Sequence, residues 1–229
     1  FAYRVEADIA NGEVELTDVY MSYGTGPLSV TAGQIKPFNG LDDMTSDLFT
    51  SFMERAAFNS GFGFERRVGL SGTYAGKAVV IQAGVFTDNA ADLNLDSNNS
   101  YSLDGRVVFM PKLGSSQLHL GGSVHVRDFN DTATSTRYRA RPFVHTTDLR
   151  LVNTGNITAT GETGYGLEFA YVRGRLHATV ESSWMRPHRP GLDDPTFNGG
   201  YAELGLLLTN DVTAYRNGAY DRIKPKTAL

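Results

Sequence analysis

This sequence of 229 residues contains no cysteine, no long apolar run and no excess of basic charge. Without cysteine the chain has no disulfides, no thiolate nucleophile and no cysteine-ligated metal. No uninterrupted apolar stretch approaches the roughly 18–20 residues of a membrane-spanning helix, but a transmembrane β-strand needs only about 9–11 alternating residues. The net charge of -4 leaves no basic surplus to attract nucleic acid, so we expect no nucleic-acid partner.

What the sequence has in abundance is an alternation of apolar and polar side chains with a period of two residues. The pattern is clear in residues 101–109 and 118–127, where apolar residues oppose serine, aspartate, histidine and arginine. Such alternation predicts β-strands with one apolar and one polar face. We count about twelve such runs of roughly ten residues, longer than the usual strand of a soluble sheet. Asn11-Gly12, between the first two runs, is a strong signal for a hairpin turn.

The connections and the polar face favour a transmembrane β-barrel over a soluble β-sandwich. Tight turns such as residues 75–77 alternate with long polar loops such as residues 87–100, an asymmetry typical of outer-membrane barrels. The polar face carries charges in mid-strand, including Arg106 and Glu168, and aromatic residues lie near several strand ends. A sandwich also alternates, but it buries its apolar face in a core. The predicted fold class is therefore all-β, a transmembrane antiparallel β-barrel.

One long segment, residues 37–64, interrupts the alternation. Long insertions in compact domains tend to be functional. Apolar residues within the segment recur at helical spacing: Leu48, Phe49, Phe52, Met53, Ala56 and Ala57. That spacing predicts a short amphipathic helix. We interpret residues 37–64 as a constriction loop that folds into the lumen, and residues 1–229 as part of a single barrel domain.

Several short motifs are spread along nearly the whole chain. They are Gly33-Gln34-Ile35-Lys36-Pro37-Phe38, Phe52-Met53-Glu54-Arg55, Arg66-Arg67-Val68-Gly69, Arg137-Tyr138-Arg139-Ala140-Arg141-Pro142, Asn153-Thr154-Gly155, Leu208-Thr209, Tyr215 and Arg222-Ile223-Lys224-Pro225. Together they resemble the phosphate-selective porin O and P family. The chain departs from that family at Asn210-Asp211, where the family usually has Gly-Glu.

The resemblance implies an anion porin, a trimeric channel of about 16 strands in the outer membrane of a Gram-negative bacterium. Its implied partners are small phosphate-like anions, outer-membrane lipid and further copies of the chain as a homotrimer, and it implies no cofactor. By that comparison we expect further barrel strands before and after this chain.

Arg137, Arg139 and Arg141 are spaced by two, so on a strand all three share one face. Facing lipid near the midplane, each would cost about 2–4 kcal/mol, so they must face water, in the lumen or at the loop end. In a lumen they offer an anion successive weak sites, and the planar guanidinium matches phosphate oxygens. The alternative interpretation is a solvated basic strand at the outer rim.

Five further basic residues are candidates for the anion path: Arg127, Lys36, Arg55, Arg66 and Arg67. If residues 37–64, which we call the insert, fold inward, the basic residues within or beside the insert place positive charge at a constriction, where low-dielectric walls focus the electric field. For Arg55, an ion pair with Glu54 that anchors the insert is an equally good interpretation. Asp42, Asp43 and Asp47 lie in the same segment and would weaken an anion preference.

The sequence carries no Gly-x-Ser-x-Gly, His-Glu-x-x-His or P-loop motif, and we expect a channel and not an enzyme. His119 and His125 alternate on a polar face without carboxylates at ligand spacing, so no metal site is expected. Two other functions remain open: a general diffusion porin without strong anion preference, and a structural barrel whose loops scaffold surface components.

Overall fold

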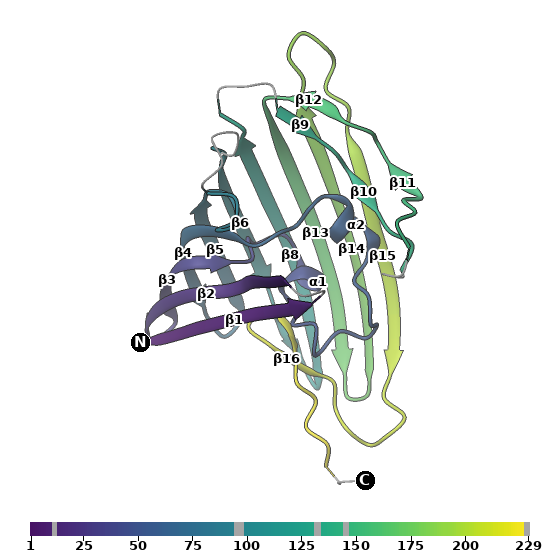
Figure 1. Cartoon of the computed structure of the whole chain (residues 1–229). Helices are drawn as coiled ribbons and strands as arrows, with labels where there is room; N and C mark the ends of the chain where they lie inside the picture. Colours follow the sequence, from purple (N-terminus) through teal and green to yellow (C-terminus); the bar gives the residue numbers. More distant parts are fainter. Residues whose placement is uncertain (11–12, 94–98, 131–133, 144–146, 227–229) are drawn as a thin grey trace.

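A computed structural model of the chain describes residues 1–10, 13–93, 99–130, 134–143 and 147–226. Figure 1 shows a strongly curved sheet with short helices and hairpins on its concave side. The sheet has 11 strands in the order β1-β2-β3-β4-β5-β6-β8-β13-β14-β15, with β7 paired to β8. The strands are β1 (Ala2–Ala10), β2 (Glu13–Thr25), β3 (Leu28–Ile35), β4 (Arg67–Ala75), β5 (Val79–Phe86), β6 (Tyr101–Phe109), β7 (Lys112–Leu113), β8 (Ser116–Asp128), β13 (Gly161–Arg173), β14 (Leu176–His188) and β15 (Phe197–Leu206). All neighbouring pairs are antiparallel, which confirms the predicted all-β class.

The apolar side chains of these strands lie on the outer face of the curved sheet. Leu103 of β6 and Leu167 of β13 are 57% and 61% exposed, whereas Arg106 and Glu168 on the same strands are 2% and 4% exposed. A sheet that packs one face on a soluble core shows the opposite arrangement. An apolar exterior around a polar interior is the arrangement of a transmembrane β-barrel.

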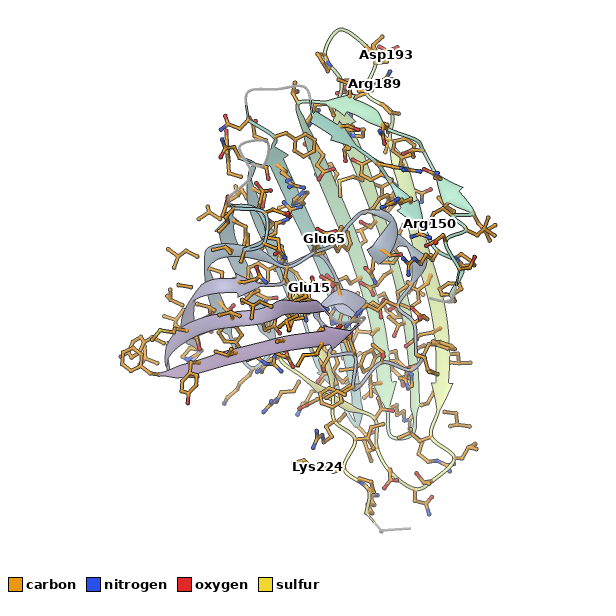
Figure 2. All side chains as sticks on the ribbon, viewed as in Figure 1. Glu15, Glu65, Arg150, Arg189, Asp193 and Lys224 are labelled. Carbon is orange, nitrogen blue, oxygen red and sulfur yellow. The ribbon has the colours of Figure 1, made fainter. Side chains whose placement is uncertain are left out.

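The connections differ in length between the two ends of the sheet. Tight turns join β2 to β3 and β13 to β14, with left-handed glycines at Gly26 (φ 56°) and Gly174 (φ 57°). Long segments join β5 to β6 and β8 to β13 at the other end, where Arg189 and Asp193 lie in Figure 2, opposite Lys224. The predicted Asn11-Gly12 turn lies outside the described residues. No helix in the described ranges is long and apolar enough to cross a membrane.

The helix predicted within residues 48–57 is wrong. The two helices of the insert are α1 (Leu41–Met44), which precedes that stretch, and α2 (Ala57–Gly61), which begins at its last residue. Leu48, Phe52 and Met53 are exposed, so their spacing does not mark a buried helical face. The Arg55 guanidinium instead donates to the Thr45 carbonyl at 2.6 Å, which closes residues 45–55 into a loop.

Three small two-stranded sheets accompany the large one: β9 (Thr134–Thr136) with β12 (Ile157–Ala159), β10 (Arg139–Ala140) with β11 (Val152–Asn153), and β16 (Ala214–Arg216) with β17 (Ala219–Asp221). The last of these packs against the inner face of the sheet, where the Tyr220 hydroxyl lies 2.6 Å from the Thr179 hydroxyl. Its turn residues Asn217 and Gly218 have φ of 51° and 81°, the left-handed pair of an Asn-Gly type I′ turn. This dipeptide is a sequence signal that the prediction of wall strands did not use.

Candidate functional site

Residues 36–66 cross the concave side of the sheet and pack against the wall formed by β13, β14 and β15 (Figure 1). Phe58 and Phe62 of α2 form a buried apolar cluster with Tyr138 and Met185. The rings of Phe62 and Tyr138 meet edge to face, with centroids 5.7 Å apart, a favoured aromatic geometry. This cluster holds the end of the insert to one side of the barrel.

On its other side the insert borders a polar cavity of about 670 Å³, which extends to β1, β2, β3 and β4. Its charged lining residues are Arg4, Lys36, Arg66, Glu6, Asp8, Asp18, Asp43 and Asp47. Acidic side chains outnumber basic ones in this lining. The open space in this part of the lumen is therefore not a purely basic passage.

Lys36 and Arg66, two of the predicted site residues, lie in this cavity as members of ion pairs. Lys36 Nζ is 3.3 Å from Asp43 Oδ1 and donates to the Asp43 carbonyl at 3.0 Å. Arg66 Nε donates to Asp18 Oδ1 at 2.8 Å, and Arg4 Nη1 to the other oxygen of Asp18 at 3.3 Å. A β-bulge in β2 at this level shifts the register and re-aims the wall side chains. Each of the two charges is thus partly neutralised.

Arg55 is bonded within the insert itself. It binds the carboxylate of Asp47, and its Nη1 lies 3.8 Å from Asp42 Oδ1. Asp42 also accepts a hydrogen bond from Asn59 Nδ2 at 2.5 Å, so one carboxylate connects α1 with α2. Burial raises the pKa of this carboxyl group. These contacts favour the structural interpretation of Arg55, with Asp42 and Asp47 as its acidic partners.

Arg67 and Arg127 point inward from the wall, Arg67 buried and Arg127 partly exposed. Arg67 is buried and lines a small void together with Phe64 and Glu162. Arg127 Nη2 donates to Asp88 Oδ1 at 2.7 Å, and Arg127 Nη1 lies 3.7 Å from Glu162 Oε1. Arg127 thus forms a charge network with Asp88 and Glu162, and neither Arg127 nor Arg67 borders the 670 Å³ cavity.

Asp88, in the loop after β5, gives this network a pH dependence. Burial raises its pKa, but hydrogen bonds from the Ser100 hydroxyl and backbone N–H and from Arg127 outweigh it, so the net pKa is lowered. A depressed pKa means that ionised Asp88 stabilises the fold above the unfolded-state pKa of about 3.9, and that this stability is lost as the pH falls through the folded-state value.

We therefore expect Asp88→Asn to lower the free energy of unfolding at pH 7. The substitution should have little effect at a pH low enough to protonate the wild-type Asp88 carboxyl in both the folded and the unfolded protein. Urea unfolding of the full-length protein in detergent, followed by circular dichroism at pH 7 and at lower pH, measures the difference. Asp92→Asn in the same loop is the control. A deficit that persists undiminished at the lowest pH would contradict the proposed role of the ionised Asp88.

The arginines at 137, 139 and 141 lie in the long connection from β8 to β13, and not in a wall strand. Only Arg139 and Ala140 form a strand, β10, which pairs with β11. The alternation still separates two faces, because Tyr138 and Ala140 are buried against α2 while all three arginines are exposed. The Tyr138 hydroxyl donates to Glu162 Oε2 at 2.7 Å, which fixes the loop ribbon formed by β10 and β11 to the wall.

A fourth arginine, Arg150, joins these three, and the sequence patterns did not indicate it. Partial desolvation, together with the positive charges of Arg141, Arg139 and Arg137, lowers the pKa of Arg150. Figure 2 shows Arg150 beside the ribbon that carries β10 and β11. The pairing of Arg139 with Asn153 brings the two parts of the loop together. Two-residue strands leave no periodic signal, so the approach of Arg150 to the other three arginines was not predictable from alternation.

A Ser–His contact also occurs on the inner face, but its geometry is not that of a hydrolase. Ser51 Oγ lies 3.0 Å from His177 Nε2, and Glu203 Oε1 lies 3.6 Å from that same nitrogen. A catalytic triad needs the acid on the other ring nitrogen, which here faces Thr213 Oγ1 at 3.4 Å. The contact ties the insert to β14 and β15. Among the residues that the structure describes, no group of three His, Cys, Asp or Glu side chains is placed to hold a metal ion.

An apolar exterior, a charged interior and a long insert on the concave face define the porin class of β-barrel proteins. The chain belongs to the phosphate-selective porin O and P family, whose model matches residues 1–228. This confirms the resemblance drawn from the motifs.

Two curated proteins and one solved structure are similar to this chain. An uncharacterised protein of Caulobacter vibrioides is 44% identical over 236 residues, which cover 99% of this chain and 48% of that protein. Porin O of Pseudomonas aeruginosa is 26% identical, over 89% of this chain and 52% of that protein. The high-pH structure of Pseudomonas putida OprB aligns with a TM-score of 0.51 at 12% identity, over 85% of this chain and 56% of that one, and this likeness shows the fold. The chain spans about half the length of the curated relatives it matches.

Proposed function

We propose that this chain is part of an outer-membrane porin through which small hydrophilic solutes diffuse passively, with a preference for anions such as phosphate. The fold and the family membership support the channel. The observation that carries the anion preference is the cluster of Arg137, Arg139, Arg141 and Arg150, which gathers four guanidinium groups on one loop ribbon.

The mechanism is electrostatic and involves no covalent step. The four arginines attract an anion and bind it through bidentate, charge-assisted hydrogen bonds. Because several such sites follow one another, the anion passes between them without being held tightly at any one. The buried Tyr138, bonded to Glu162 and packed on Phe62, keeps the ribbon in place. An outer-membrane location and a homotrimer are part of the proposal, and cross-linking of the purified protein in detergent tests the trimer.

Arg139→Ala is expected to lower the ratio of anion to cation permeability by up to about fivefold, because an exposed charge contact is worth up to about 1 kcal/mol. Reversal potentials of the full-length protein in planar bilayers under a salt gradient measure this ratio. Arg175→Ala, in the tight turn between β13 and β14, is the matched control and should leave the ratio unchanged. An unchanged ratio in Arg139→Ala would place the cluster outside the ion path.

The acid-rich lining of the 670 Å³ cavity favours a second candidate, a general diffusion porin without strong charge preference. In that case the wild-type channel has a reversal potential near zero in a salt gradient. A clear anion preference of the wild type would reject this candidate, and a clear cation preference would reject the first.

A further inference from the structure

The beginning of the insert is held to the barrel wall by two side chains. The Ser123 hydroxyl of β8 donates to the Asn39 carbonyl at 2.7 Å. Glu181 of β14 accepts two consecutive backbone N–H groups, that of Leu41 at 2.6 Å on Oε1 and that of Asp42 at 2.8 Å on Oε2. Each carboxylate oxygen therefore binds one N–H at the point where the insert turns into α1.

The surroundings of Glu181 fit a fixed anchor. Its carboxylate is buried and also accepts the Tyr201 hydroxyl on Oε2 at 2.8 Å, so three donors converge on it. Gly40 makes the close approach possible, because a Cβ at that position would lie 2.7 Å from Glu181 Oε1. Buried backbone N–H groups that lose their acceptor are costly. A substitution at Glu181 removes an acceptor of this contact, and a substitution at Gly40 pushes the backbone away from that acceptor.

Asp42, whose backbone N–H binds Glu181, also connects α1 with the residues around α2 through its side chain. Its side chain binds Asn59 at 2.5 Å and the backbone N–H of Ala56 at 3.0 Å, and Arg55 lies 3.8 Å away. A displacement of Asp42 away from the wall therefore carries the residues around α2 with it. The same insert forms one side of the 670 Å³ cavity, so its position sets the width of that cavity.

We propose that Glu181 is the positioning residue that holds the insert against the wall and thereby sets the open cross-section of the channel. The proposal rests on the proposed function only in requiring that the barrel conducts, and it does not depend on anion preference. Glu181→Gln keeps the shape of the side chain but turns an amide NH₂ toward one of the two backbone N–H groups. One acceptor is then lost, which weakens the contact between the beginning of the insert and β14.

Single-channel recordings of the full-length protein in planar bilayers test this. Glu181→Gln is expected to lose the wild-type conductance level and to show a higher, noisier one, and Gly40→Ala is expected to do the same. Glu15→Gln, the same chemical change on an exposed residue of β2, should retain the wild-type level (Figure 2). A wild-type conductance in both folded variants, Glu181→Gln and Gly40→Ala, overturns the proposal.

A disulfide supplies a rescue test, since the chain has no other cysteine. A Cβ built on Gly61 of α2 lies 3.9 Å from the Cβ of Ala140 in β10, within the range that a disulfide spans. Oxidised Gly61→Cys/Ala140→Cys is expected to restore the wild-type conductance to Glu181→Gln, and reduction to abolish the rescue. If the oxidised pair leaves the higher conductance unchanged, displacement of α2 is not what raised the conductance, and the proposal fails.

The proposed channel function and the proposed role of Glu181 can be rejected independently of each other. A wild-type protein that forms no channel rejects the proposed function. The anchor is then tested by the rate at which the Gly61→Cys/Ala140→Cys pair oxidises, which should fall when Glu181→Gln is added. An unchanged rate rejects the anchor.

Discussion

Arg106→Leu is expected to lower the free energy of unfolding by about 3–5 kcal/mol, the usual effect of leaving one charge of a buried pair uncompensated. Arg106 Nε and Nη2 donate to the two oxygens of Glu168 at 2.8 and 2.6 Å, and both side chains are almost fully buried. Arg106 Nη2 also donates to the Gly218 carbonyl at 2.8 Å, so the substitution removes a partner of the β16–β17 hairpin as well.

The pair spans β8, which lies between β6 and β13 in the sheet. Gly121 of β8 leaves room for it, since a Cβ there would lie 3.0 Å from the Glu168 carboxylate. His119 Nε2 lies 3.0 Å from the same carboxylate. The wall strands, the pair and the inner hairpin are therefore one connected unit, and removing Arg106 affects all three.

Equilibrium unfolding in urea, with the full-length protein in lipid vesicles, measures the loss. Arg106→Leu/Glu168→Leu should recover most of it, because an apolar pair of similar volume often replaces a buried ion pair at little net change. Arg175→Leu, at an exposed turn, is the control. A loss below about 1 kcal/mol for Arg106→Leu would mean that water reaches Glu168 and stabilises its charge.

The sequence predicted the wall of this protein well because lipid and lumen impose a simple period. Leu103 stands at an odd position of β6 and Arg106 at an even one, and this alternation alone decides which face of the strand each side chain occupies. The same rule placed Arg67 and Arg127 on the inner face. It did not show that Arg67 lies buried beside Phe64 or that Arg127 pairs with Asp88, because these contacts come from other segments of the chain, which the alternation along one strand does not describe.

The contacts inside the lumen were harder to predict, because they join residues that lie far apart in the sequence. The contact of Glu181 with Leu41 joins residues 140 positions apart, and a sequence read locally contains no signal for it. The helical spacing of Leu48 and Phe52 did not predict a helix correctly, since these side chains are exposed and Arg55 closes this part of the insert into a loop by polar contacts. Polar networks need no periodicity, only partners at the right distance.

Leu167→Arg is expected to destabilise the barrel in a bilayer by about 2–4 kcal/mol, the cost of a cation on the lipid face near the midplane. Leu167 stands at the middle of β13 and its side chain is 61% exposed on the outer face, next to Glu168 on the inner face. The opposed residues Gly122 and Ser182 are small, so an arginine clashes with neither, and lipid remains the main source of the cost.

Leu208→Arg supplies the matched control, since Leu208 is exposed beyond the end of β15. It should change the free energy of unfolding in vesicles by no more than about 0.5 kcal/mol, as is usual for surface sites. The ratio of the two effects measures whether the apolar face meets lipid. Equal effects at Leu167 and Leu208 would show that the exposed apolar face of β13 packs against protein or water, and the barrel interpretation of this sheet would fail with it.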